Sequence, residues 1–132
     1  MLYKRVASRW LKASLPKAPK IKDSAEAQRI QNMDWESWER VHLPDDPSKY
    51  FLNDKDLVKI PVGQIKRTRA RAGGIVRANR LMWLAYNGMS PKRQPITLKR
   101  EKDGVYSVVD GNSTFTNIMD SNWKVVWATL SP

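Results

Sequence analysis

Near the start of the chain, apolar residues recur at helical spacing in two short stretches. Between residues 3 and 15 the apolar positions alternate with basic ones, which predicts a basic amphipathic helix that ends before Pro16. A second helix is predicted to begin at Ser24, a suitable N-cap. Its apolar stripe consists of Ile30, Met33 and either Trp35 or Trp38. The turn that contains Asp45 and Asp46 ends this helical region.

From residue 57 onward, strand-like and helix-like patterns follow one another without an internal repeat. The predicted order is strand 57–62, helix 75–85, strand 95–100, strand 105–109, a helix carrying Phe115, Ile118 and Met119, and strand 125–130. Pro61 suits an edge strand. Asp103-Gly104 predicts a tight hairpin between strand 95–100 and strand 105–109. The pattern predicts an α+β fold with a small mixed sheet and helices, preceded by a helical basic arm.

Charge divides the chain into three segments. The chain of 132 residues has 24 Lys plus Arg against 13 Asp plus Glu, a formal net charge of +11. Residues 1–22 carry only basic charges and form the predicted arm, whereas acids outnumber bases in the helical and loop segment 23–56. Residues 57–100 again contain no Asp or Glu. They form the first part of the predicted domain, residues 57–132.

A strongly basic chain of this kind points to a polyanionic partner, DNA or RNA. The side chains expected to contact it are Lys66, Arg67, Arg69, Arg71, Arg77, Arg80, Lys92 and Arg93. The sequence has no helix-turn-helix or zinc-finger pattern for reading bases, so contacts to the phosphate backbone are expected to dominate. Solubility alone is the alternative explanation of the charge.

Composition excludes several classes of function. The chain has no cysteine, which excludes disulfide scaffolds, cysteine-ligated metals and thiol chemistry. Its single histidine, His42, makes a histidine-rich metal site or a Ser/His/Asp triad a poor explanation. No apolar run is long enough to span a membrane.

The basic arm, residues 1–22, has several interpretations. It suits a nucleic-acid arm or a membrane-surface helix, and equally a helix docked on the domain or a flexible tail. It also resembles an organelle transit peptide, but its enrichment in serine and arginine is slight. The expected location is therefore the cytoplasm of a bacterial or phage-infected cell, and organelle targeting is not expected.

Two tryptophans in the acidic segment, Trp35 and Trp38, are candidates for stacking on nucleic-acid bases. Their acidic neighbours Asp34, Glu36 and Glu39 repel a phosphate backbone, so packing in the core is the favoured interpretation. The Asp45-Asp46 pair is likewise interpreted as a solvated turn rather than a catalytic pair of carboxylates.

A glycine turn precedes the last predicted helix. A turn of this kind presents backbone N–H groups and the positive end of the helix dipole, which together can bind an anion. The candidate phosphate-binding residues are Gly111, Asn112, Ser113 and Thr114. Asp110 is placed to hold Mg²⁺ beside a bound phosphate and is the candidate catalytic residue. The same residue types also suit an ordinary turn and helix cap.

The succession of these segments resembles the ParB N-terminal/sulfiredoxin-like domain family across residues 57–130. The matching segments are, in order, LVKIPVGQI, a helix ending in LAYNGM, then PITLKREKDGVYSVVDGNSTF and NWKVVWATL. In that family a V-x-I-P strand precedes a helix, a Q-P-I strand pairs with a hairpin strand, and a glycine turn opens the next helix. Gln94-Pro95-Ile96 and Val109-Asp110-Gly111-Asn112 match this pattern in order and spacing.

The resemblance implies that the glycine turn binds nucleotide phosphates with help from an arginine of the turn. The sequence does not identify a cofactor; Mg²⁺ beside Asp110 and a nucleoside triphosphate at the turn are the candidates. The sulfiredoxin branch places a catalytic cysteine in this turn, where the present chain has Asn112, Ser113 and Thr114, so the sulfiredoxin reaction is excluded. The arginine is missing too. The loop before the preceding helix lies where the family carries a phosphate-facing arginine, and its Arg67, Arg69 and Arg71 are the candidates to compensate, with Arg71 taken as the phosphate-binding residue.

Three classes of function remain open on the sequence. The first is a ParB-like module that binds nucleic acid by contacting the phosphate backbone of the nucleic acid, and that has an altered or vestigial nucleotide site. The second is an enzyme of the same fold, a metal-dependent nuclease or a phosphotransferase, with Asp110 as its anchor and Asp103 or Asp120 as a second acid. The third is a non-catalytic structural or interaction protein of a phage, plasmid or other mobile element, which binds a protein partner or self-associates.

Overall fold

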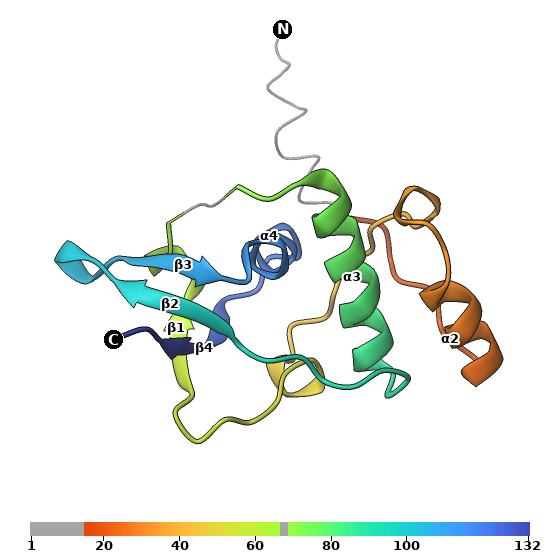
Figure 1. The fold of residues 1–132 in the computed structure, drawn as a ribbon, viewed down its shortest axis with the longest axis horizontal. Helices are drawn as coiled ribbons and strands as arrows, with labels where there is room; N and C mark the ends of the chain where they lie inside the picture. The colour runs from red at the N-terminus through yellow and green to blue at the C-terminus, as the bar shows by residue number, and fades with distance from the viewer. Residues whose placement is uncertain (1–14, 67–68) are drawn as a thin grey trace, which may run out of the picture.

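The computed structural model describes residues 15–66 and 69–132 (Figure 1). These residues form an α+β fold with three α-helices and four strands, as predicted. The helices are α2 (Ser24–Gln31), α3 (Ala72–Tyr86) and α4 (Asn112–Asp120). The strands are β1 (Val58–Pro61), β2 (Ile96–Arg100), β3 (Tyr106–Asp110) and β4 (Val125–Leu130).

The strands form one mixed sheet in the order β1-β4-β2-β3. β4 runs antiparallel to β1 and parallel to β2, and β2 pairs with β3 as an antiparallel hairpin. β1 lies at an edge, as Pro61 predicts. At the tip of the hairpin, Asp103 and Gly104 have φ of 64° and 72°, the positive values that a type I′ turn requires. The predicted mixed sheet and hairpin are confirmed.

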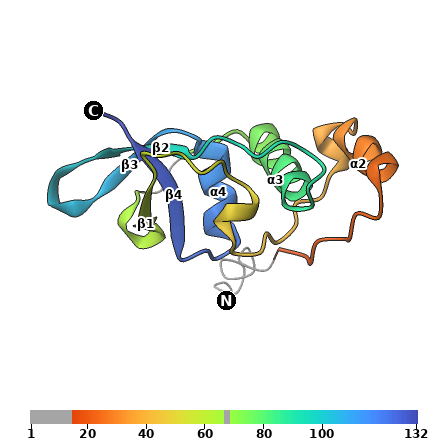
Figure 2. The same ribbon diagram turned by 90° about the horizontal axis from the view of Figure 1, so that it is seen from below.

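The helices follow one another outward from the sheet. α4 contacts β2 and β3, α3 packs against α4, and α2 packs against α3. Figure 2 shows this succession along the long axis of the molecule. α3 and α4 are therefore neighbours although β2 and β3 separate them in the sequence, and this neighbourhood builds the candidate site.

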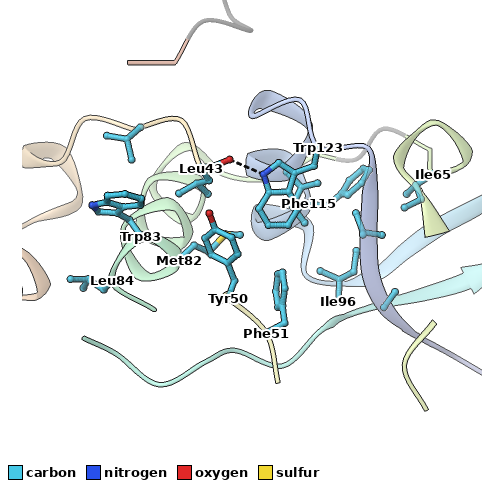
Figure 3. Packing of buried hydrophobic residues seen from close by; sticks show 14 of the residues in the cluster. Leu43, Tyr50, Phe51, Ile65, Met82, Trp83, Leu84, Ile96, Phe115 and Trp123 are labelled. Carbon is cyan, nitrogen blue, oxygen red and sulfur yellow. Dashed lines mark hydrogen bonds between the residues drawn. The ribbon is translucent and has the colours of Figure 1, made fainter. Parts of the chain in front are cut away.

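The acidic segment shares one hydrophobic core with the residues that follow it. Tyr50 is fully buried, and its ring lies 5.0 Å from that of Trp123 and 5.3 Å from that of Tyr86 (Figure 3). The indole Nε1 of Trp123 donates to the carbonyl of Leu43 at 2.8 Å, and the Tyr50 hydroxyl donates to the carbonyl of Pro44 at 2.6 Å. Burial is the largest cause that raises the pKa of this hydroxyl far above its usual value. Residues 41–51 thus belong to the same folded unit as the sheet.

The second predicted helix differs from the structure at both ends. Asp23, not Ser24, is the N-cap, and its carboxylate accepts from the N–H of Glu26 at 2.9 Å. The helix ends at Gln31, before Met33 and the two tryptophans. A tertiary contact explains why the tryptophans lie outside the helix. The indole N–H of Trp38 donates to Asn79 on α3, which places Trp38 in the core outside the helical stripe.

Two asparagines that face each other from α3 and α4 join three parts of the chain. The side chains of Asn79 and Asn117 are fully buried. Asn79 Oδ1 accepts from the backbone N–H of Val41 at 2.9 Å, and its amide Nδ2 donates to Asn117 Oδ1 at 3.0 Å. Asn117 Oδ1 also accepts from Arg40, whose guanidinium forms an ion pair with Asp120 at 2.9 Å. Buried polar groups with this many partners fix one arrangement of the surrounding segments.

Residues 15–22 run beside the core, with the N–H of His42 donating to the carbonyl of Pro16 at 2.8 Å and Trp83 Nε1 donating to that of Pro19 at 2.9 Å. The predicted helix over residues 3–15 falls almost entirely outside the described residues. Within the described part of the chain, no helix has the length and apolar character needed to cross a membrane.

Candidate anion-binding site

The first turns of α3 and α4 touch each other. A Cβ at Gly74, in the first turn of α3, would lie only 2.8 Å from Oγ of Ser113 in the first turn of α4. The approach of the two helices at this level therefore depends on glycine at position 74. The sequence pattern shows the Gly73-Gly74 pair, but only the fold shows which segment approaches it.

Both helices present the positive end of their dipole at this contact. Their N-cap residues, Arg71 for α3 and Gly111 for α4, make no side-chain capping hydrogen bond. Neither helix has an acidic residue in its first turn. The partial positive charge of each N-terminus is thus not neutralised by a neighbouring carboxylate of its own helix.

Gly111 sets the angle at which α4 leaves β3. Its φ is +104°, in the left-handed region, and a Cβ there would lie 2.7 Å from Cγ2 of Ile96 on β2. Its carbonyl accepts the first helical hydrogen bond, from the N–H of Phe115 at 2.8 Å. The predicted glycine turn and helix start are confirmed at this position.

A cavity of about 560 Å³ lies at the junction of the two helices. It is lined by Arg69, Ala70, Arg71, Gly74, Asn112 and Ser113. The two arginines are exposed, and no acidic residue lines the cavity. Guanidinium groups beside helix N-termini are suited to phosphate or carboxylate ligands, which they can hold through paired hydrogen bonds.

The remaining residues of the turn line a second, smaller cavity of about 280 Å³. Arg93 lies there with Asp110, Gly111 and Thr114, and its Nη2 is 3.5 Å from Oγ1 of Thr114. Burial lowers the pKa of Arg93, whose guanidinium nevertheless stays protonated. The structure therefore splits the predicted phosphate site, with Asn112 and Ser113 facing Arg71 and with Gly111 and Thr114 facing Arg93.

Asp110 lines the same cavity as Arg93. Of the other two acids considered, Asp120 forms an ion pair with Arg40 and Asp103 occupies the hairpin turn. The part of the chain that the structure describes contains no cluster of three or more His, Asp or Glu side chains suited to a metal. A single carboxylate is a poor fit to Mg²⁺, so no metal-dependent step is assigned to these residues.

The basic side chains predicted to contact nucleic acid do not share one environment. Lys66, Arg69, Arg71, Arg77 and Lys92 are exposed, and Arg93 is half-buried. The prediction is wrong for Arg80, which is 6% exposed and donates through Nη1 to the carbonyl of Met33. Arg80 thereby joins α3 to Met33, two residues beyond the end of α2, and its burial keeps it from a phosphate in solution. Arg67 lies outside the described residues.

A comparison of the sequence with protein-family models found no match, and a comparison with curated proteins found none either.

Proposed function

We propose that this protein binds nucleic acid mainly through its phosphate backbone, with a phosphate held in the cavity between α3 and α4. The observation that carries the proposal is the convergence of two helix N-termini and two exposed arginines, Arg69 and Arg71, on one cavity without an acidic residue. Each element alone is common in proteins. Together they create a local positive potential at one place, which favours a strongly acidic ligand.

The surroundings of the cavity favour a polymer over a single small anion. The cavity of about 560 Å³ is large enough to hold a phosphate group with part of the molecule attached to it. Exposed Arg77 lies one turn along α3 from Gly74, so the positive surface continues beyond the cavity. A chain of phosphates can use such a surface at several points, whereas one phosphate ion uses only the cavity.

A divergent ParB-like domain is the form of this proposal that the sequence favours. The glycine turn opens α4, and Arg71 lies beside Asn112 and Ser113, where it can replace the arginine that the turn lacks. The enzymatic alternatives rest on Asp110, which belongs to no metal-suited cluster of side chains among the described residues. A lone carboxylate gives little support to metal-dependent catalysis, so binding without catalysis is the better supported function.

The proposal predicts a salt-dependent affinity that drops when the cavity loses its arginines. Fluorescence anisotropy of a labelled oligonucleotide, titrated at several salt concentrations between about 50 and 200 mM, measures this slope. Arg69→Ala/Arg71→Ala is expected to make the log–log slope shallower by about 1.4 for a single strand or 1.8 for a duplex, one phosphate contact for each arginine. The matched control is Lys102→Ala/Lys124→Ala, which removes the same charge outside the cavity.

The control variant is expected to keep the wild-type slope within about half a unit. Equal losses in the two double variants would refute the cavity as the phosphate site while leaving a diffuse electrostatic attraction. Wild-type protein that shows no salt-dependent binding to DNA or RNA would refute the proposed function altogether.

A further inference from the structure

Trp35 lies with one face of its indole on the first turn of α3. A Cβ at Gly73 would be 3.3 Å from Cε2, 3.4 Å from Cδ2 and 3.5 Å from Nε1 of Trp35. A point beyond the ring edge, in the ring plane, would be much closer to the edge atoms than to Cδ2, which lies at the ring fusion. The nearly equal distances therefore place Gly73 over the face of the ring. The absence of a side chain at position 73 lets the indole lie flat on the helix.

Part of this indole remains open to solvent. Trp35 is 41% exposed, whereas Trp38 is 8% exposed and its Nε1 donates to the buried Asn79. The packing interpretation of the two tryptophans thus holds for Trp38 and describes only the inner face of Trp35. An outward-facing indole face held against a helix is the geometry on which a nucleobase stacks.

The indole of Trp35 and the phosphate cavity both adjoin the first turn of α3. Gly73 meets Trp35, and the adjacent Gly74 meets Ser113 at the cavity. Gly73 and Gly74 are consecutive residues, so Trp35 and the cavity meet the same turn of α3. The exposed residues Arg71 and Ala72 lie at the start of this turn. Neighbouring nucleotides of an unpaired strand can reach both.

The residues beside Trp35 are acidic, whereas those at the cavity are basic, and a nucleotide has a neutral base and a negatively charged phosphate to match them. Exposed Asp34 and Glu36 flank Trp35, and they repel phosphate but not a neutral base, whose N–H groups can donate hydrogen bonds to their carboxylates. Arg69 and Arg71 lie on the cavity side and attract phosphate. A strand crossing the end of α3 is therefore oriented with a phosphate toward Arg71 and a base toward Trp35.

We propose that the nucleic acid bound by this protein is single-stranded and that one of its bases stacks on the open face of Trp35 while a neighbouring phosphate occupies the cavity. The inference rests on the proposed function and specifies its ligand. Bases inside a duplex are already stacked on each other, so a duplex has no free face to offer along its length. A single strand offers both groups together.

The first test compares two substitutions on two ligands. Trp35→Ala is expected to weaken binding of a single-stranded oligo(dT) by about 5- to 100-fold, while Trp35→Phe keeps most of the affinity. The salt slope is expected to stay unchanged, because the phosphate contacts remain. Binding of a duplex of the same length is expected to be equal in all three proteins. Leu130→Ala, at an apolar residue 37% exposed at the end of β4, controls for the loss of exposed apolar surface.

The second test observes the stacking itself. Tryptophan fluorescence of the wild-type protein is expected to drop on saturation with oligo(dT), and the drop is expected to be largely absent in Trp35→Phe. The phenylalanine variant also guards against misfolding, since it keeps an aromatic ring on Gly73. The inference would be overturned if Trp35→Ala bound oligo(dT) as tightly as the wild-type protein does. It would also be overturned if Trp35→Ala weakened duplex binding as much as single-strand binding. Wild-type protein that binds neither ligand at low salt would instead overturn the proposed function.

Discussion

Asn117→Ala is expected to destabilise the protein by about 3 to 5 kcal/mol, enough to consume much of the stability of a domain this size. Asn117 is fully buried, and its amide makes bonds in four directions. Its Oδ1 accepts from Asn79 and Arg40, and its Nδ2 donates to the carbonyls of Ile75 and Ser113 at 2.9 and 3.0 Å. Alanine leaves Asn79 and the two carbonyls with one bond fewer each and Arg40 with two fewer, all of them at buried or half-buried residues.

The loss is larger than that of one hydrogen bond, because the cost of a buried polar group without a partner exceeds the net gain of forming the bond. Arg40 keeps Asp120 but loses the oxygen that orients its guanidinium. Chemical denaturation followed by circular dichroism measures the change, with Asn53→Ala, at an exposed position, as the control for asparagine removal. A denaturation midpoint equal to that of the control would contradict the role assigned to the network.

The second large effect is expected at Gly111. Gly111→Ala is expected to cost about 2 to 4 kcal/mol, because it combines a left-handed backbone with a Cβ 2.7 Å from Ile96 Cγ2. Gly88→Ala is the matched control, since its φ of +72° is also positive but nothing lies within 4 Å of its Cβ position. It is expected to cost only about 1 kcal/mol, the backbone contribution alone.

The contact with Ile96 is tested separately by a double-mutant cycle. Ile96→Ala removes Cγ2 and opens space for the new methyl group, so the double variant Gly111→Ala/Ile96→Ala is expected to be more stable than the sum of the single changes indicates. Thermal or chemical unfolding of the four proteins gives the coupling. Strict additivity would show that the backbone conformation, and not the collision, makes glycine necessary here.

The sequence predicts the elements between residues 57 and 130 well, because each is bounded by a strong local signal. Pro61, the Asp103-Gly104 turn and Gly111 each determine the conformation of only a few neighbouring residues. The structure has the predicted feature at all three positions. The pairing of β2 with β4 in parallel has no local signal. It depends on which strands α3 and α4 bring together.

Sequence patterns predict burial poorly for residues whose side chains bond to a distant segment of the chain. Arg80 counts as a surface charge in the composition, yet it is buried against the carbonyl of Met33. Asn79 and Asn117 similarly look like polar positions of amphipathic helices, and only their partners on other segments make their burial favourable.

The candidate site shows the same division. The glycine turn and the basic loop are visible in the sequence, so Arg71, Asn112 and Ser113 are predicted and then found on one cavity. The contacts of Gly73 with Trp35 and of Gly74 with Ser113 are not predictable, because each joins a glycine to a residue about 40 positions away. A glycine pair reports that something approaches closely, but not what approaches.

The bonds of residues 38–43 have a consequence for how the chain folds during synthesis. Leu43 and Trp123 bond across 80 positions, as do Arg40 and Asp120, so each of these contacts closes a loop that spans more than half of the chain. Tyr50 has been made long before Trp123 leaves the ribosome, and until then its ring lacks that neighbour. The core therefore closes late, and a chain that stops short of Trp123 leaves its first third without the partner that buries it.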